Sequence, residues 1–233
     1  MPPVQIRRWH VYSDTASLRQ DVVDALIVVA NHSIKQRGRF CIVLAGGRTP
    51  ASIYQALRHA ATDWSGWHIY FGDERCLPVG DPERNDCMAR SCWLDHVPVP
   101  EKQIHPIPAE LGSEVGARAY EKVIAGIDRF DLVLLGLGED GHTASLFPGY
   151  ELGTDQAAPA VLTVRDAPKP PPERISLSAR RLSTSDRLWF IVAGADKAQA
   201  LEMWRHDRDI PARFICPERG VDIYTDIDVV DTG

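Results

Sequence analysis

The sequence has few cysteines, and their spacing follows no recognisable motif. Five cysteines occur among 233 residues, and none of them forms a Cys-x-x-Cys pair. Because their number is odd and their spacing irregular, we expect neither a disulfide framework nor a structural zinc site. We interpret them as reduced thiols, with Cys76 beside Arg75 as the one whose neighbouring cation favours the thiolate.

Long apolar runs are also missing. The longest candidates are Val22–Ala30, which contains Asp24, and Leu132–Leu137. Both fall short of the roughly 18 residues that a membrane span needs. The segment Met1–Gln5 has no apolar core after a basic start, so we expect no signal peptide. We therefore predict a cytoplasmic protein without a membrane partner.

Positive charge is in deficit. The chain has 26 lysines and arginines against 32 aspartates and glutamates, which gives a net charge of −6. A protein that binds nucleic acid normally carries a basic excess, so we predict no such partner. An anionic ligand would have to meet a local cluster of cations. Since we find no internal repeat and no clear linker, we expect a single α/β domain over residues 1–233.

Short apolar runs alternate with segments of helical periodicity. We expect strands at Phe40–Ala45, Trp67–Phe71, Phe130–Leu135, Arg174–Ser178, Leu188–Ala193 and Val221–Thr225. We expect helices between Ser13–Asp14 and Gly38, from a Thr49 cap onward, and at Asn85–Leu94, Ser113–Ala125 and Asp196–Trp204. This alternation predicts a three-layer, Rossmann-like αβα fold, with a mainly parallel sheet flanked by helices on both faces.

Ligands of such sheets bind outside the carboxyl ends of the strands. Four loops of unusual chemistry follow predicted strands, at 46–50, 72–75, 136–142 and 194–197, and we expect them to converge. The first, Gly46-Gly47-Arg48-Thr49-Pro50, suits a phosphate, because glycine lets backbone N–H groups approach a ligand. A tight turn before a capped helix explains this segment equally well. No P-loop motif occurs.

Charged residues mark two more of these loops. Arg75 in the triplet Asp73-Glu74-Arg75 can grip an anion with two parallel hydrogen bonds, although such a triplet alone is usually a solvated charge run. Lys197 is poorly placed for the dipole of the helix that it begins, which indicates that its charge serves a ligand. Arg180 or its neighbour Arg181 is expected to face the same site.

The loop Gly136–His142 formally matches the dinucleotide fingerprint Gly-x-Gly-x-x-Gly. Glu139 and Asp140 would place negative charge at the pyrophosphate, and Pro148 limits any following helix, so we disfavour a nucleotide.

His142 at the end of this loop is a candidate general base, with Asp140 fixing its tautomer. A metal site built from nearby carboxylates is a minor alternative, and the serine-hydrolase motif Gly-x-Ser-x-Gly is absent. We expect no metal and no cofactor.

The chain resembles the 6-phosphogluconolactonase family over nearly its whole length. The matching segments are Leu44–Pro50, Asp73–Pro78, Asn85, Gly136–Gly149, Arg174–Ser178 and Gly194–Lys197. The resemblance implies hydrolysis of 6-phospho-D-glucono-1,5-lactone to 6-phosphogluconate in the oxidative pentose phosphate pathway. His142 would activate a water, with Asp140 orienting its ring. The expected substrate contacts are Gly46, Gly47, Arg48, Thr49, Asp73, Arg75, Asn85, Gly141, Arg180 and Lys197. The only partner expected is the sugar-phosphate lactone, and we expect a monomer or weak homodimer.

Two residues depart from the family pattern, and two alternative functions must be compared with lactone hydrolysis. Arg48 and Arg84 stand where the family usually has serine, so each either loses a hydroxyl contact or adds charge for phosphate. The related glucosamine-6-phosphate deaminases and isomerases carry glutamate where this chain has Phe147 and tyrosine where it has Arg75. Because phenylalanine supplies no acid–base group, the isomerase reading is disfavoured. A non-catalytic sugar-phosphate sensor is the third possibility.

Overall fold

The computed structural model of the protein describes residues 4–228. Its main sheet has seven strands in the order β1-β10-β9-β6-β2-β3-β5, and every neighbouring pair is parallel. These strands are β1 (Arg7–Val11), β2 (Phe40–Leu44), β3 (Trp67–Phe71), β5 (Ile104–His105), β6 (Leu132–Leu135), β9 (Leu188–Val192) and β10 (Val221–Thr225).

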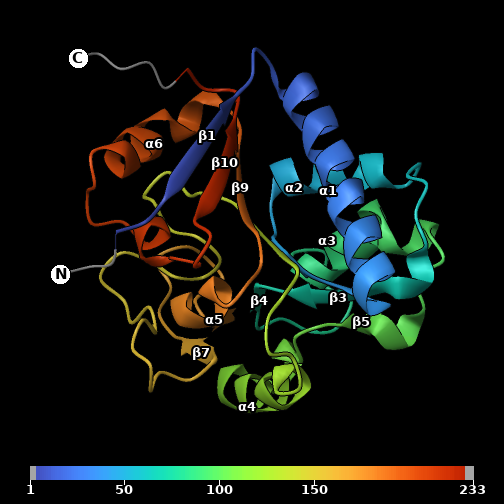
Figure 1. Ribbon diagram of the computed structural model, residues 1–233. Helices are drawn as coiled ribbons and strands as arrows, with labels where there is room; N and C mark the ends of the chain where they lie inside the picture. Colours follow the sequence, from blue (N-terminus) through green and yellow to red (C-terminus); the bar gives the residue numbers. More distant parts are fainter. Residues whose placement is uncertain (1–3, 229–233) are drawn as a thin grey trace.

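Helices flank the sheet on both sides. They are α1 (Thr15–Arg37), α2 (Arg48–Leu57), α3 (Asn85–Cys92), α4 (Ser113–Ile124), α5 (Ala179–Ser183) and α6 (Ala198–Arg205). Figure 1 shows α1, α2 and α3 together on one side, with α5 and α6 on the other. The predicted three-layer architecture is therefore confirmed. Within the described chain, no helix has both the length and the apolar character needed to cross a membrane.

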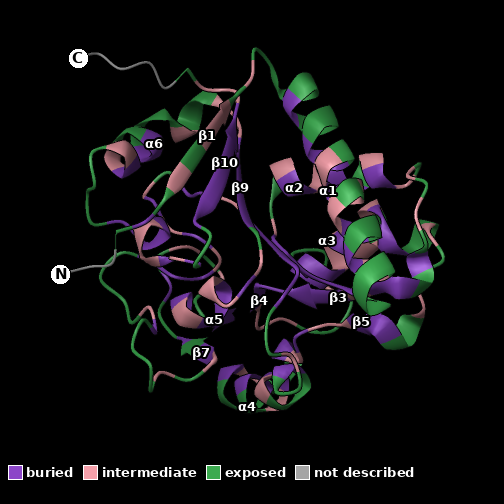
Figure 2. Ribbon diagram, viewed as in Figure 1, coloured by how far each residue is buried: buried purple, intermediate pink, exposed green. Residues whose placement is uncertain are grey.

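The centre of the sheet forms the core because its strands are apolar throughout. Every residue of β2, β6 and β9 is buried, as expected for strands that helices cover on both faces. Figure 2 shows these buried strands between helices whose outer faces are exposed. The limits of α1 are those that the sequence predicts. Asp14 accepts a hydrogen bond from the backbone N–H of Ser17, and Gly38 ends the helix at φ 71°.

The start of α2 differs from the prediction. The helix begins at Arg48, with Gly47 as its N-cap and no side-chain cap, so Thr49 does not cap it. Gly47 takes this role because its φ of 102° suits glycine. The predicted helix at Asp196–Trp204 is divided into a 3-10 turn, Ala195–Lys197, and α6.

A second sheet is the main feature that the sequence did not predict. It is antiparallel, in the order β4-β8-β7, and consists of β4 (Asp73–Arg75), β8 (Arg174–Leu177) and β7 (Val161–Val164). The predicted strand at Arg174–Ser178 therefore exists, but it lies in this small sheet. The sheet begins directly after β3, so it extends one wall of the region where the main strands end.

Candidate active site

Residues from all four predicted loops line one cavity of about 330 Å³. The loops follow β2, β3, β6 and β9, which are neighbours in the order β9-β6-β2-β3, so their carboxyl ends meet at one edge. The predicted convergence is thus confirmed. The volume falls in the range of small-molecule sites.

The cavity is locally basic although the whole chain is acidic. Five cations line it, against two carboxylates, those of Asp73 and Asp196. The cations are Arg48, Arg75, Lys169, Arg174 and Lys197. This excess contrasts with the net charge of −6 for the chain and is the local cluster that an anionic ligand would require.

Two of the arginines face each other across the small sheet. Arg75 of β4 and Arg174 of β8 are directly opposed in the antiparallel register. Like charges in this position repel each other, so the pairing is unfavourable unless an anion lies between them or nearby. Burial, reinforced by the charge of Arg75, lowers the pKa of Arg174. Within the described residues, the buried Arg75 Nε has no hydrogen-bond partner, whereas its Nη1 donates to the Glu83 carbonyl.

His142 and Asp140 form a hydrogen-bonded dyad at the same cavity. Asp140 Oδ1 contacts Nδ1 of the imidazole, and the histidine side chain is 19% exposed. Burial lowers the pKa of His142, although the hydrogen bond and the charge of Asp140 oppose this change. A lowered pKa keeps the ring neutral and able to accept a proton near neutrality, as a general base must. The predicted pairing of the two side chains is therefore present in the structure.

The backbone of this loop is shaped around the dyad. A Cβ on Gly138 would overlap the imidazole ring of His142, so only glycine fits there. The backbone N–H of Gly138 donates to the His142 carbonyl at 2.7 Å, and that of Gly141 donates to the Gly138 carbonyl at 3.0 Å. Both N–H groups are used by the fold of the loop and are not free to stabilise an oxyanion.

Asp73 and Asn85 connect the walls of the cavity. Asn85 Nδ2 donates to the carbonyl and to the carboxylate of Asp73, at 2.9 and 3.1 Å. The other Asp73 oxygen accepts from Ser145 Oγ at 2.6 Å, three residues beyond His142. A Cβ on Gly46 would overlap the Asn85 amide, so the first loop lies directly against this side chain. A short polar chain from Asn85 through Asp73 to Ser145 therefore joins the second loop to the start of α3 and to the segment that follows His142, and the first loop packs against it.

The other predicted site residues divide into two groups. Gly46, Gly47, Arg48, Thr49, Asn85 and Lys197 line the cavity. Lys197 Nζ lies 3.1 Å from Asp196 and 3.8 Å from Glu139. Gly141 and Arg180 are not among the lining residues. Gly141 packs against Ile210, and Arg180 on the short helix α5 donates instead to the Ala158 carbonyl at 3.0 Å.

Sequence reasoning missed two lining cations, Lys169 and Arg174. Arg174 donates to the carbonyls of Lys169, Pro170 and Pro171, and so holds the proline-rich loop against the site. Lys169 Nζ lies 3.9 Å from Asp140 Oδ1. The sequence does contain a signal for them: Lys169 is a single cation in a proline-rich loop, and Arg174 follows at the start of a strand. Their position at the cavity becomes evident only once the second sheet is known.

This arrangement can bind an anionic group and move a proton beside it. Among residues 4–228, no group of three or more histidine, cysteine or carboxylate side chains is placed to hold a metal ion. The chemistry that the side chains themselves offer is electrostatic binding by the cations and general-base catalysis by the dyad.

Comparisons with known proteins give a consistent result. Residues 13–224 match the family described as glucosamine-6-phosphate isomerases/6-phosphogluconolactonase. A 6-phosphogluconolactonase of Synechocystis sp. is 40% identical over 199 residues, which cover 80% of this chain and 81% of that protein. One of Mycobacterium leprae is 36% identical over 205 residues, covering 82% and 83%. The crystal structure of 6-phosphogluconolactonase from Thermotoga maritima superposes with a TM-score of 0.87 at 26% identity, covering 94% of this chain and 99% of that one.

Proposed function

Because the chain belongs to the glucosamine-6-phosphate isomerase/6-phosphogluconolactonase family, we propose that it hydrolyses 6-phosphogluconolactone to 6-phosphogluconate. The observation that carries this proposal is the His142–Asp140 dyad, which lies at a cavity whose lining cations outnumber its carboxylates. A phosphorylated sugar lactone needs both features, since it carries an anionic group at one end and an electrophilic carbonyl at the other. The consequent place of the reaction is the oxidative branch of the pentose phosphate pathway.

Cations of the small sheet hold the phosphate, together with cations that lie where the helices after β2 and β9 begin. Arg75 offers its free Nε, and Arg174 lies opposite it in the sheet register. An anion bound there relieves the repulsion between the two guanidinium groups. Lys197 adds a further positive charge from the end of β9. These contacts hold the substrate in one orientation, so its lactone ring extends toward the dyad.

The dyad then carries out the proton transfer. His142 removes a proton from a water molecule as the water oxygen bonds to the lactone carbonyl carbon. The ring C–O bond breaks, and the imidazolium returns the proton to the departing oxygen, which becomes the hydroxyl of the open acid. Asp140 holds the ring and stabilises its charged form. Lys169, whose Nζ lies 3.9 Å from Asp140 Oδ1, stabilises the negative charge that develops on the carbonyl oxygen.

Isomerisation or deamination of an aminosugar phosphate is less well supported. Phe147 is fully buried, its ring centroid lies 4.8 Å from that of His142, and the guanidinium of Arg174 lies over its face at 5.6 Å. The position beside the histidine is thus occupied by an apolar ring. It cannot supply the second acid–base group that ring opening and proton shuttling require.

The test is the release of acid from freshly prepared 6-phosphogluconolactone, corrected for its spontaneous hydrolysis. We expect strong acceleration with the phosphorylated lactone and much weaker acceleration with glucono-1,5-lactone. A rate no higher than the spontaneous one would reject the lactonase assignment. Conversion of glucosamine 6-phosphate in a parallel assay would support the isomerase alternative.

A further inference from the structure

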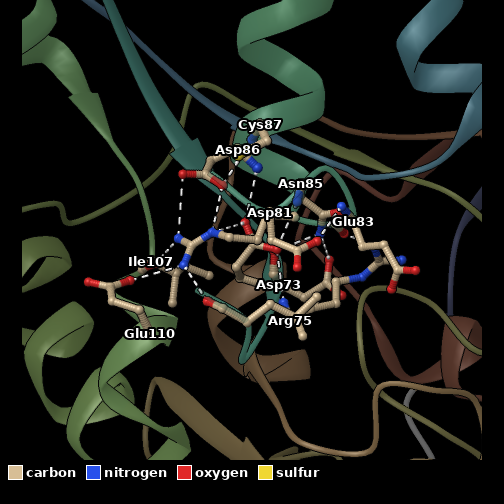
Figure 3. Close-up of polar contacts among 12 residues, drawn as sticks. Asp73, Arg75, Asp81, Glu83, Asn85, Asp86, Cys87, Ile107 and Glu110 are labelled. Carbon is tan, nitrogen blue, oxygen red and sulfur yellow. Dashed lines mark hydrogen bonds and ion pairs between the residues drawn. The ribbon is translucent and has the colours of Figure 1, made fainter. Parts of the chain in front are cut away.

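Arg84 lies beside the cavity but is closed off from it. Its side chain is only 2% exposed. The guanidinium donates five hydrogen bonds: two to Asp86, at 2.8 and 3.4 Å, one to Glu110 at 3.0 Å, and one each to the carbonyls of Leu77 and Ile107, at 3.1 and 3.0 Å (Figure 3). Since a guanidinium has five N–H donors, none remains for a ligand. Arg84 therefore adds no phosphate contact.

Glu74, next to Arg84, is completely buried and binds backbone rather than solvent. Its carboxylate accepts N–H groups from Arg75 at 2.8 Å, from Asn85 at 2.7 Å and from Asp86 at 3.0 Å. The Nε of Arg84 lies 3.9 Å from its second oxygen. Burial raises the pKa of Glu74 to about 8, although the three N–H groups favour the charged carboxylate and oppose this rise.

The bonds to Glu74 join two parts of the cavity wall. Arg75 ends β4, whereas Asn85 begins α3, and both side chains line the cavity. The backbone N–H groups of both residues donate to the side chain of Glu74, which thereby fixes their positions relative to each other. The Asn85 side chain then bonds Asp73. A displaced Glu74 would therefore move Arg75 and Asn85 together.

We propose that Arg84 is a positioning residue for substrate binding. Its guanidinium pairs with the carboxylates of Asp86 and Glu110, lies 3.9 Å from Glu74, and ties α3 to the segment that carries Glu110. The start of α3 is thereby fixed, so Arg75 and Asn85 point into the cavity. This inference rests on the proposed function, and it explains why a saturated, inaccessible arginine stands directly before a cavity residue.

The test compares Arg84→Met with a matched control, Arg181→Met. Arg181 is also buried, donates to the carbonyls of Ile127 and Thr184, and is not among the cavity-lining residues. We expect Arg84→Met to raise KM for 6-phosphogluconolactone about ten-fold while kcat falls by less than about three-fold. Arg84→Lys, with three donors, should restore part of the loss. The control should lower the urea midpoint without changing KM.

A double variant separates positioning from general loosening. If Arg84 acts through Asn85, Arg84→Met should change KM less in an Asn85→Ala background than in the wild-type background. Additive effects on KM, or an unchanged KM in Arg84→Met, would overturn the proposal. Should Arg84→Met fail to fold, Glu110→Ala removes one hydrogen-bond acceptor of Arg84, at a side chain that is 30% exposed, and should raise KM about two-fold. An unchanged KM in this variant would overturn the proposal as well.

Binding of the product gives a readout that does not depend on turnover. We expect Arg84→Met to weaken calorimetric binding of 6-phosphogluconate about ten-fold, and the control to leave it unchanged. If the wild type binds the product but does not hydrolyse the lactone, the proposed function fails while the positioning role is still tested. Equal product affinity in wild type and Arg84→Met would reject the positioning role alone.

Discussion

The cavity and the neighbouring Arg84 cluster both take charged side chains out of water. They differ in whether the donors of their arginines have hydrogen-bond acceptors. In the cluster, all five donors of Arg84 have acceptors. At the cavity, Arg75 Nε has no partner among the described residues, and two arginines oppose each other in the sheet register. Arg84 therefore serves the structure alone, whereas Arg75, which lines the cavity, keeps one donor without a protein partner.

The largest expected effect is at the dyad. His142→Ala should lower kcat about 10²–10⁴-fold, because general-base catalysis is lost, while the affinity for 6-phosphogluconate stays near the wild-type value. Steady-state kinetics and calorimetry measure the two quantities. His59→Ala, at an exposed histidine, serves as control and should leave both unchanged. Wild-type turnover in His142→Ala would remove the dyad from the mechanism.

Gly138→Ala should lower kcat about 10–100-fold, because the new Cβ would overlap the imidazole and displace it from Asp140. KM should change much less, since the cations at the small sheet are untouched. Gly126→Ala is the matched control, because nothing lies within 4 Å of a Cβ at that position. Normal kcat in Gly138→Ala would show that the position of the ring is not limiting.

Arg75→Gln contrasts most directly with Arg84. Because Arg75 has an unused donor at the cavity, its loss should raise KM for the phosphorylated lactone about ten-fold. Hydrolysis of glucono-1,5-lactone should be nearly unaffected. The free energy of unfolding should change by less than about 1 kcal/mol, in contrast to the loss expected for Arg84→Met. An equal effect on both lactones would show that Arg75 does not bind the phosphate.

The smallest expected effect is on the pH profile. The pKa of His142 lies below its ordinary value because of burial, and Asp140 partly offsets this by favouring the charged ring. Activity that needs the neutral ring is lost as the pH falls through this pKa. Asp140→Asn removes the offsetting charge, so the acid limb of kcat/KM should move to lower pH. A limb that moves to higher pH would contradict the assigned pairing.

Five of the seven strands of the main sheet, and the pairing of His142 with Asp140, could be predicted because their signals are local, whereas the edge strands β1 and β5 were not predicted. Phe40–Leu44 leads through Ala45 into two glycines, and Leu132–Leu135 is followed directly by glycine. Both patterns are typical of buried parallel strands with ligand-binding exits. The dyad was predictable for the same reason, since Asp140 and His142 are two residues apart in a loop of unusual composition.

The small sheet as a unit, and the place of Arg174 in the cavity wall, could not be predicted, because they depend on long-range contacts. β4 has only three residues and β7 four, which is too short for a periodicity to appear. Arg174 reaches the cavity through its pairing with Arg75, about a hundred residues earlier in the chain. Arg180, three residues beyond the end of β8, was predicted to reach the cavity, but its contact with Ala158 holds it elsewhere.

A crystal structure with 6-phosphogluconate bound tests the account most directly. We predict a phosphate oxygen within hydrogen-bond distance of Arg75 Nε, close to Arg174, and the carboxylate of the product beside the ring of His142. A phosphate bound away from the small sheet, or a carboxylate separated from His142 by the sugar chain, would contradict the assignment of the two ends of the cavity.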